Sequence, residues 1–378
     1  MKTRRDFLKG ISLGAAGFVV PRIAAAAPVR SRKPNIIIIL ADDLGYADLS
    51  CYGHKTIKTP NIDAMARGGL KFTDFHSNGA VCSPTRAALL TGRYQQRCGV
   101  TGVVTASRHR EVGMAIDETT FAEVLGRTGY ATGIFGKWHV GYAPKFNPTK
   151  QGFDEYVGFV SGNVDYHAHV DQVGYLDWWK RDKIENEKGY ITDLITNYGL
   201  KFIEKHKDKP FCLYLPHGAP HYPIQGRNTP PQRNVTRGPF AERGAGSRGP
   251  KGKTGKRKRA VNPRTRALYR EMIEVMDEGV GRIVAKVREL GLEKDTLIVF
   301  MSDNGPARLG SAGPLRGRKG QIWEGGHRVP AVMYWPGKIK GPTTTGQTAM
   351  GIDLFATMVE MSGESLPDGV KLDGVSLL

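Results

Sequence analysis

With 378 residues and a hydrophobic composition of 40%, the chain is long enough to bury a sizeable core in one large or two medium domains. Its four cysteines, Cys51, Cys82, Cys98 and Cys212, show no CxxC spacing, so the sequence indicates neither a disulfide scaffold nor a thiolate zinc site. The net charge of +19 would suit a polyanionic partner, but residues 227–266 carry most of it, with nine Arg and four Lys against one Glu.

The first 27 residues predict an export signal and not a part of the fold. A twin-arginine pattern at Arg4 and Arg5 is followed by the apolar run 11–20 and by four alanines at 24–27. Because the apolar run is too short to span a membrane, we expect no stable membrane insertion once the signal is removed. The predicted destination is the bacterial periplasm or the extracellular space, reached through the twin-arginine translocase.

Four short apolar runs along the chain each end in polar residues that can bind a metal or an anion. The runs and the residues that follow them are 35–40 with Asp42 and Asp43, 131–135 with Lys137 and His139, 211–215 with His217 and His221, and 296–300 with Asp303 and Asn304. Runs of this kind are typical of parallel strands buried on both faces, and such sheets bind ligands beyond the carboxyl ends of their strands.

Helical patterns alternate with these runs. They cover Ile62–Arg67, Phe121–Arg127, Ile191–Lys205 and Thr265–Leu290, and the last repeats apolar residues at intervals of three and four. We find no internal repeat. The pattern predicts an α/β fold of three layers with one main domain from residue 33 to 378.

The basic segment 227–266 is rich in Gly, Pro and Asn and lacks hydrophobic periodicity, which predicts a long mobile loop. Phe240 is its only aromatic residue, so we expect no nucleic-acid partner. A solvated insertion is the favoured interpretation, and an electrostatic tether for an anionic polysaccharide stays open.

Cys82 lies at the predicted start of a helix, with Pro84 in its first turn and Arg86 four residues on. A helix N-terminus lowers the pKa of a nearby thiol, which favours a reactive cysteine. From position alone, a buried structural cysteine is an equally good interpretation.

Three carboxylates and an amide, Asp42, Asp43, Asp303 and Asn304, offer oxygen ligands from two strand ends. Oxygen-only sites favour Ca²⁺ or Mg²⁺ over zinc, although each pair alone would also suit a turn. Several cationic candidates accompany them, namely Arg86, Lys137, His139, His221 and Lys319, with His217 as a weaker one. A divalent cation surrounded by such positive groups is suited to bind an ester of a doubly charged oxyanion.

Together these segments resemble the formylglycine-dependent sulfatases of the alkaline phosphatase superfamily. Residues 82–86 match the family's Cys-x-Pro-x-Arg signature, and residues 87–94 match its continuation. The other matching blocks, in the expected order, are 41–45, 136–141, 220–223, 302–305 and 319–326. The resemblance spans residues 33–378 and implies a catalytic domain with an alkaline-phosphatase-like α/β/α sandwich around a mostly parallel sheet.

The resemblance implies a modified nucleophile and a metal. A maturation enzyme would oxidise Cys82 to Cα-formylglycine, whose hydrated aldehyde would attack the sulfur of a sulfate ester. Asp42, Asp43, Asp303 and Asn304 would hold Ca²⁺, with Mg²⁺ as the alternative.

The resemblance also implies a role for each cationic candidate. Arg86 and Lys137 would orient the aldehyde hydrate, while His221 and Lys319 would bind the sulfate and assist protonation of the leaving group. His139 would deprotonate the second hydroxyl so that sulfate is expelled and the aldehyde returns.

The substrate side is indicated by residues 161–167, which resemble a substrate loop of bacterial members and point to Asn163, Asp165 and His167. The pair Trp178 and Trp179 suits either stacking on a sugar ring or packing in the core, and packing is the more common role. We expect a sulfated small molecule or carbohydrate as the substrate.

Residues 372–378 resemble the join that precedes a small C-terminal antiparallel subdomain in the family. The expectation is therefore that this subdomain is absent or truncated, although every predicted site residue precedes that point.

Two other functions stay open at this point. One is a phosphodiester or phosphonate monoester hydrolase of the same superfamily, and the other is an inactive sulfatase-like protein that binds sulfated polysaccharide through the basic segment. The presence of all candidate catalytic residues favours an enzyme, with a sulfuric ester hydrolase as the predicted activity.

Overall fold

The computed structural model describes residues 33–240 and 262–378. The predicted export signal and most of the strongly basic part of the 227–266 segment lie outside these residues.

Within the described residues, eleven strands form one sheet in the order β10-β2-β9-β8-β1-β7-β3-β4-β5-β6, with β11 also paired to β2. The strands are β1 (Asn35–Ala41), β2 (Leu70–His76), β3 (Ala131–Lys137), β4 (Glu155–Phe159), β5 (Trp179–Lys180), β6 (Lys183–Ile184), β7 (Phe211–Pro216), β8 (Thr296–Ser302), β9 (Arg328–Tyr334), β10 (Thr343–Thr345) and β11 (Ala349–Met350).

The five central strands, β8, β1, β7, β3 and β4, run parallel, whereas β9 is antiparallel to both of its neighbours. Strand β1 lies at the centre, where Ile38 pairs with Tyr214 on one side and with Val299 on the other. The predicted mostly parallel sheet is confirmed, since all four predicted apolar runs are strands of this central part.

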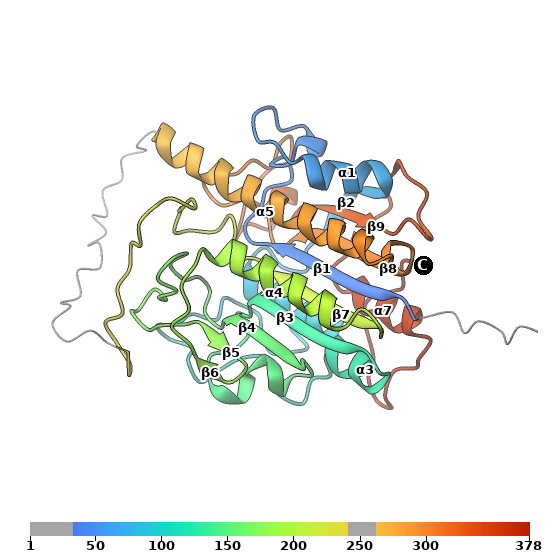
Figure 1. Ribbon diagram of the computed structural model, residues 1–378, viewed down its shortest axis with the longest axis horizontal. Helices are drawn as coiled ribbons and strands as arrows, with labels where there is room; N and C mark the ends of the chain where they lie inside the picture. The colour runs from blue at the N-terminus through green and yellow to red at the C-terminus, as the bar shows by residue number, and fades with distance from the viewer. Residues whose placement is uncertain (1–32, 241–261) are drawn as a thin grey trace, which may run out of the picture. The chain divides into compact units, whose positions relative to one another are not determined.

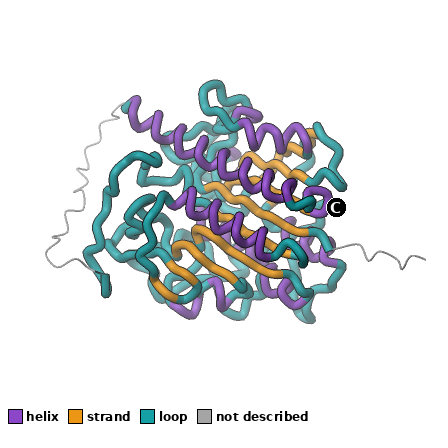
Figure 2. Tube along the Cα trace, in the orientation of Figure 1, coloured by secondary structure: helices purple, strands orange, loops and turns teal. Residues whose placement is uncertain are grey.

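Helices cover both faces of the sheet, which makes the three predicted layers (Figure 1). Their bounds are α1 (Pro60–Gly68), α2 (Cys82–Thr91), α3 (Phe121–Arg127), α4 (Ile191–Lys205), α5 (Pro263–Glu289), α6 (Glu324–His327) and α7 (Asp353–Ser362). Figure 2 shows the long helices α4 and α5 side by side across the strands. All four predicted helical segments are present, with α3 and α4 at the predicted bounds.

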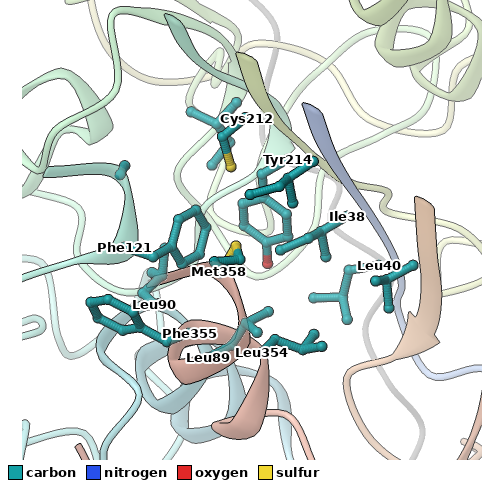
Figure 3. Packing of buried hydrophobic residues seen from close by; sticks show 14 of the residues in the cluster. Ile38, Leu40, Leu89, Leu90, Phe121, Cys212, Tyr214, Leu354, Phe355 and Met358 are labelled. Atoms are coloured by element: carbon teal, nitrogen blue, oxygen red, sulfur yellow. The ribbon is translucent and has the colours of Figure 1, made fainter. Parts of the chain in front are cut away.

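The core consists of two apolar clusters separated by the sheet. Alternate residues of β1 point to opposite faces, so Ile38 and Leu40 face one cluster while Ile37 and Ile39 face the other. Figure 3 shows the first cluster, in which Leu89 of α2, Phe121 of α3 and Phe355 of α7 pack beneath the sheet. Because every residue of β1 is buried, its continuous Ile run fits a strand covered on both faces.

The basic segment differs from the prediction at its C-terminal end, because α5 begins at Pro263 and not at 265. Asn262 accepts a hydrogen bond from the Arg264 amide at 2.9 Å, and Pro263 occupies the first helical position. At the other end of the segment, Arg227 is held by ion pairs to Asp193 and Glu278.

All four cysteines are free thiols. In residues 33–240 and 262–378, none of the helices is both long and apolar enough to pass through a lipid bilayer.

Candidate active site

The carboxyl ends of β1, β3, β7 and β8 meet at one edge of the sheet, because these strands are parallel neighbours. Backbone hydrogen bonds continue beyond the strands and fix the connecting loops. The Asp303 amide donates to the Ala41 carbonyl at 3.0 Å, and the Asp42 amide donates to the Ala219 carbonyl at 2.9 Å. The predicted residues that follow the four strands are thereby brought to one place.

The oxygen-bearing residues Asp42, Asp43, Asp303 and Asn304 are all buried at this edge. Asn304 Nδ2 donates to Asp43 Oδ1 at 2.8 Å, and the Asp43 amide donates to Asp303 Oδ1 at 3.2 Å. Asn304 Oδ1 is buried without a hydrogen-bond partner. An unpaired buried acceptor beside three carboxylates fits a set of ligands for a hard divalent cation.

Positive side chains balance the carboxylates. Lys137 Nζ lies 2.6 Å from Asp42 Oδ2, and Lys319 Nζ donates to Asp43 Oδ1. Burial alone would raise the pKa of Asp42, but the charges of Lys137, His221 and Arg86 together outweigh it and the pKa is lowered. Asp42 is therefore a carboxylate despite complete burial.

Arg86 links helix α2 to the buried carboxylates and to Lys137, and its side chain is completely buried. Its Nη2 and Nε donate to Asp303 Oδ2 at 2.7 and 3.1 Å, and its Nη1 donates to the Lys137 carbonyl at 3.0 Å. The guanidinium therefore connects the ends of β3 and β8, which suits its planar array of donors.

Cys82 is the first residue of α2, as predicted, and lies between Lys319 and Asp42. Its Sγ is 3.3 Å from Lys319 Nζ and 3.6 Å from Asp42 Oδ1. The prediction of a lowered thiol pKa is wrong, because burial raises the pKa of Cys82 to about 12 despite the charges of Lys137 and Lys319. The thiol is thus protonated at neutral pH and a weak nucleophile.

His139 is held in a left-handed backbone conformation, with φ of 61°. Its Nε2 lies 2.9 Å from the Val104 carbonyl oxygen, which can only accept, so Nε2 carries the proton and the buried Nδ1 is left with a free lone pair. Burial and the charge of Lys137 hold the pKa of His139 well below its usual value. Gly162 is required beside the ring, because a Cβ there would lie 2.7 Å from Nε2.

His221 has the opposite arrangement. Its Nδ1 donates to the Tyr222 carbonyl at 2.8 Å, which leaves Nε2 directed toward Asp43 Oδ2 at 3.6 Å. Burial lowers the pKa of His221, while Asp42 and Asp43 oppose the shift.

A cavity of about 300 Å³ opens onto these groups. Its lining includes Cys82, Val104, His139, Asn163, His221 and Lys319. The cavity therefore gives a small anionic group access to Cys82 with cationic and imidazole side chains around it.

Of the three predicted substrate-side residues, Asn163 alone is part of the cavity lining. Asp165 accepts from the backbone amides of residues 167, 168, 232 and 233, and His167 Nε2 lies 3.0 Å from the Gly226 carbonyl. Both residues order the loop behind the cavity. Trp178 is completely buried, which agrees with packing and not with stacking on a sugar.

Sequence reasoning missed the cavity wall made by Val104 and Tyr222. Val104 lies in a loop without a motif, and it contributes a backbone carbonyl, so the sequence contains no signal for it. Tyr222 follows His221 inside a matched block, is 48% exposed and stacks on the His221 ring with centroids 4.4 Å apart.

A family comparison gives the decisive observation, because the sulfatase family model matches residues 34–364. The chain belongs to the sulfatase family. It is 35% identical to arylsulfatase A of Homo sapiens over 97% of its own length and 71% of the relative's length. It is also 33% identical to N-acetylgalactosamine-6-sulfatase of Mus musculus, covering 94% of this chain and 67% of that one.

Solved structures agree with this family. Ps i-CgsB in complex with k-i-k-neocarrahexaose superposes with a TM-score of 0.78 at 32% identity, covering 92% of this chain and 75% of that one. The phosphonate monoester hydrolase of Agrobacterium radiobacter, at 21% identity and a TM-score of 0.60, shares the fold. The protein is therefore a sulfatase with an alkaline-phosphatase-like fold, and sulfate ester hydrolysis is its reaction class.

Proposed function

We propose that the protein cleaves the S–O bond of a sulfate monoester, with Cys82 converted to Cα-formylglycine as its nucleophilic residue. The supporting observation is the position of Cys82 at the cavity, 3.3 Å from Lys319 Nζ, with a thiol pKa raised to about 12 by burial. A thiol that stays protonated is poorly suited to attack, whereas an aldehyde hydrate at this position would meet the same cationic groups.

Asp42, Asp43, Asp303 and Asn304 would hold a divalent cation, Ca²⁺ or alternatively Mg²⁺. The all-oxygen donor set and the unpaired Asn304 Oδ1 support this assignment. A bound dication supplies a Lewis acid for a sulfate oxygen.

The cationic side chains divide the remaining tasks. Arg86 and Lys137, fixed by Asp303 and Asp42, would orient the nucleophilic group from the buried side. Lys319 and His221 border the cavity and would bind the sulfate and protonate the leaving oxygen, while His139 Nδ1 would accept a proton when sulfate is expelled.

A sulfated carbohydrate is the proposed substrate class. The similar structure of Ps i-CgsB contains a neocarrahexaose, and BT4656, at 25% identity and a TM-score of 0.70, is in complex with D-glucosamine-2-N,6-O-disulfate. Asn163 and Tyr222 offer this chain polar and aromatic contacts at the cavity.

Partners and location follow from the same proposal. A formylglycine-generating enzyme would act on Cys82, and the twin-arginine translocase would carry the folded protein to the periplasm or the outside of the cell. Deleting residues 1–27 should retain the protein in the cytoplasm, which cell fractionation measures.

The test is to express the protein with and without a formylglycine-generating enzyme and to compare intact-peptide mass spectra across Cys82 with turnover of an aryl sulfate. We expect turnover to rise in proportion to aldehyde content. Cys82→Ala should lose on the order of 10³-fold or more, whereas Cys98→Ala, at another buried free thiol, should retain activity.

A fully active Cys82→Ala enzyme would refute the nucleophile. Preference for an aryl phosphate or phosphonate over the aryl sulfate would instead favour the phosphorus-ester alternative. Polysaccharide binding that disappears on deletion of 227–266, in preparations that hydrolyse no sulfate ester, would favour the inactive binding protein.

A further inference from the structure

A second group of metal-binding side chains lies where β2 meets β9. These strands are antiparallel, with His76 opposite Arg328, which places His76 next to His327. The two histidines face each other with Nδ1 atoms 2.9 Å apart and ring centroids 5.1 Å apart. Glu324, three residues before His327 on α6, completes a group whose ligand atoms all lie within 4.8 Å of one another.

The outer nitrogens of both rings define their tautomers. His76 Nε2 lies 3.1 Å from Asp74 Oδ1, and His327 Nε2 lies 3.2 Å from the Ile322 carbonyl. Both partners are acceptors, so each neutral ring carries its proton on Nε2. Two Nδ1 lone pairs then face each other at 2.9 Å, an arrangement that a metal ion or a shared proton between them would stabilise.

We propose that His76, His327 and Glu324 form a binding site for a first-row transition metal ion such as Zn²⁺. Imidazole nitrogen is a ligand for Zn²⁺, Co²⁺ or Ni²⁺, whereas Ca²⁺ prefers oxygen. Two Zn–N bonds of about 2.0–2.1 Å at a tetrahedral angle separate the nitrogens by about 3.3 Å, so the rings need to open by only a few tenths of an ångström.

The surroundings of the pair are those of a metal ligand set. A histidine that binds a metal usually donates its other N–H to a carboxylate or a backbone carbonyl, and here Asp74 and Ile322 provide these acceptors. Arg328 contacts both Asp74 and Glu324, so two carboxylates share a single guanidinium in this group of three side chains. The net local charge is therefore favourable for a dication.

The proposed ion would connect residues 319–327, which include Lys319, to residues 76–80, which precede Cys82. The His327 carbonyl accepts from the Ser77 amide at 2.8 Å, and the Gly320 amide donates to the Ala80 carbonyl at 2.7 Å. A metal between His76 and His327 adds a further connection between residues 76–80 and 319–327. The site is structural and lies apart from the carboxylate group of Asp42.

The test is a Zn²⁺ titration of the full-length chain by calorimetry, with bound metal counted by mass spectrometry. A Cys82→Ala background removes the only thiol in the other cluster, and excess Ca²⁺ occupies the oxygen ligands there. We expect the chain to bind one Zn²⁺. His327→Gln should lower the affinity for Zn²⁺ at least 100-fold. Asp74→Asn should weaken binding about 10- to 100-fold.

His206→Gln is the matched control, because His206 Nε2 also contacts a carboxylate, Glu155 Oε1 at 2.8 Å, but His206 belongs to no group of metal-binding side chains within residues 33–240 and 262–378. It should bind Zn²⁺ as the background does. If circular dichroism shows that His327→Gln does not fold, Glu324→Gln, at an exposed side chain, should still weaken Zn²⁺ binding about tenfold. Absence of Zn²⁺ binding, or equal binding in all variants, would overturn the proposal and leave a shared proton between the rings.

Discussion

The two clusters of metal-binding side chains differ in donor atoms and in burial. The Asp42 cluster offers carboxylate and amide oxygens that are completely buried, and Arg86, Lys137 and Lys319 supply positive charge beside them. The His76 cluster offers two imidazoles and one carboxylate, and its histidines are partly exposed.

The two donor sets differ in how much positive charge they require from the protein around them. A buried cluster of carboxylates requires positive side chains even before an ion binds, because unpaired buried charges are costly. The His76 cluster has one carboxylate and two imidazoles, lies near solvent and has Arg328 beside it, paired to Asp74. If both proposals hold, donor chemistry would direct a hard ion to the first cluster and a transition metal to the second.

The largest expected change in stability comes from removing the arginine of the Asp42 cluster, and removing the arginine of the His76 cluster is the comparison. Arg86→Ala leaves Asp303 buried without its partner and should lower the free energy of unfolding by about 3–5 kcal/mol. Arg328→Ala, whose side chain is 26% exposed, should cost about 1 kcal/mol or less. Urea denaturation in the presence of a chelator measures both. Equal costs would mean that the buried carboxylates do not depend on Arg86 for their charge.

The next largest effect is a loss of stability in acid, caused by His217 at the carboxyl end of β7. His217, whose amide donates to the Leu40 carbonyl, is completely buried, and burial lowers its pKa to about 4. The unfolded chain takes up this proton near pH 6.5, but the folded protein does so only near pH 4. Stability should therefore be complete above pH 6.5 and fall by up to about 3 kcal/mol as the pH drops to 4.

His217→Gln should remove most of that fall, which urea denaturation at several pH values between 4 and 7 would reveal. A slope that is the same in the variant and the wild type would show that the imidazole is already solvated in the folded protein.

The first cluster could be predicted from the sequence because parallel strands force their carboxyl ends together. Asp42, Lys137 and Asp303 each follow an apolar run, so the sheet geometry alone brings them to one edge. The pKa of Cys82 could not be predicted, because its helix position is local whereas its burial depends on Asp42, Lys319 and the loops around them.

The cluster of His76, Glu324 and His327 could not be predicted in this way, because no motif in the sequence connects these residues. His76 and His327 are 251 residues apart, and the antiparallel pairing of β2 with β9 decides that they meet. Likewise, the contact of His139 with the Val104 carbonyl involves backbone from an irregular loop, which no side-chain pattern encodes.

The smallest expected effect tests ion selectivity at a single ligand. Asn304→Ala removes the unpaired Oδ1 and should weaken Ca²⁺ binding about tenfold or more, while Zn²⁺ binding at His76 stays unchanged. Asn304→Asp keeps an oxygen ligand and should lose less, which separates ligation from the loss of the Nδ2 contact to Asp43. Calorimetry with each ion in turn measures both affinities. If Asn304→Ala bound Ca²⁺ as the wild type does, the buried oxygen would belong to the hydrogen-bonded loop and not to the metal, and the first cluster would depend on its three carboxylates alone.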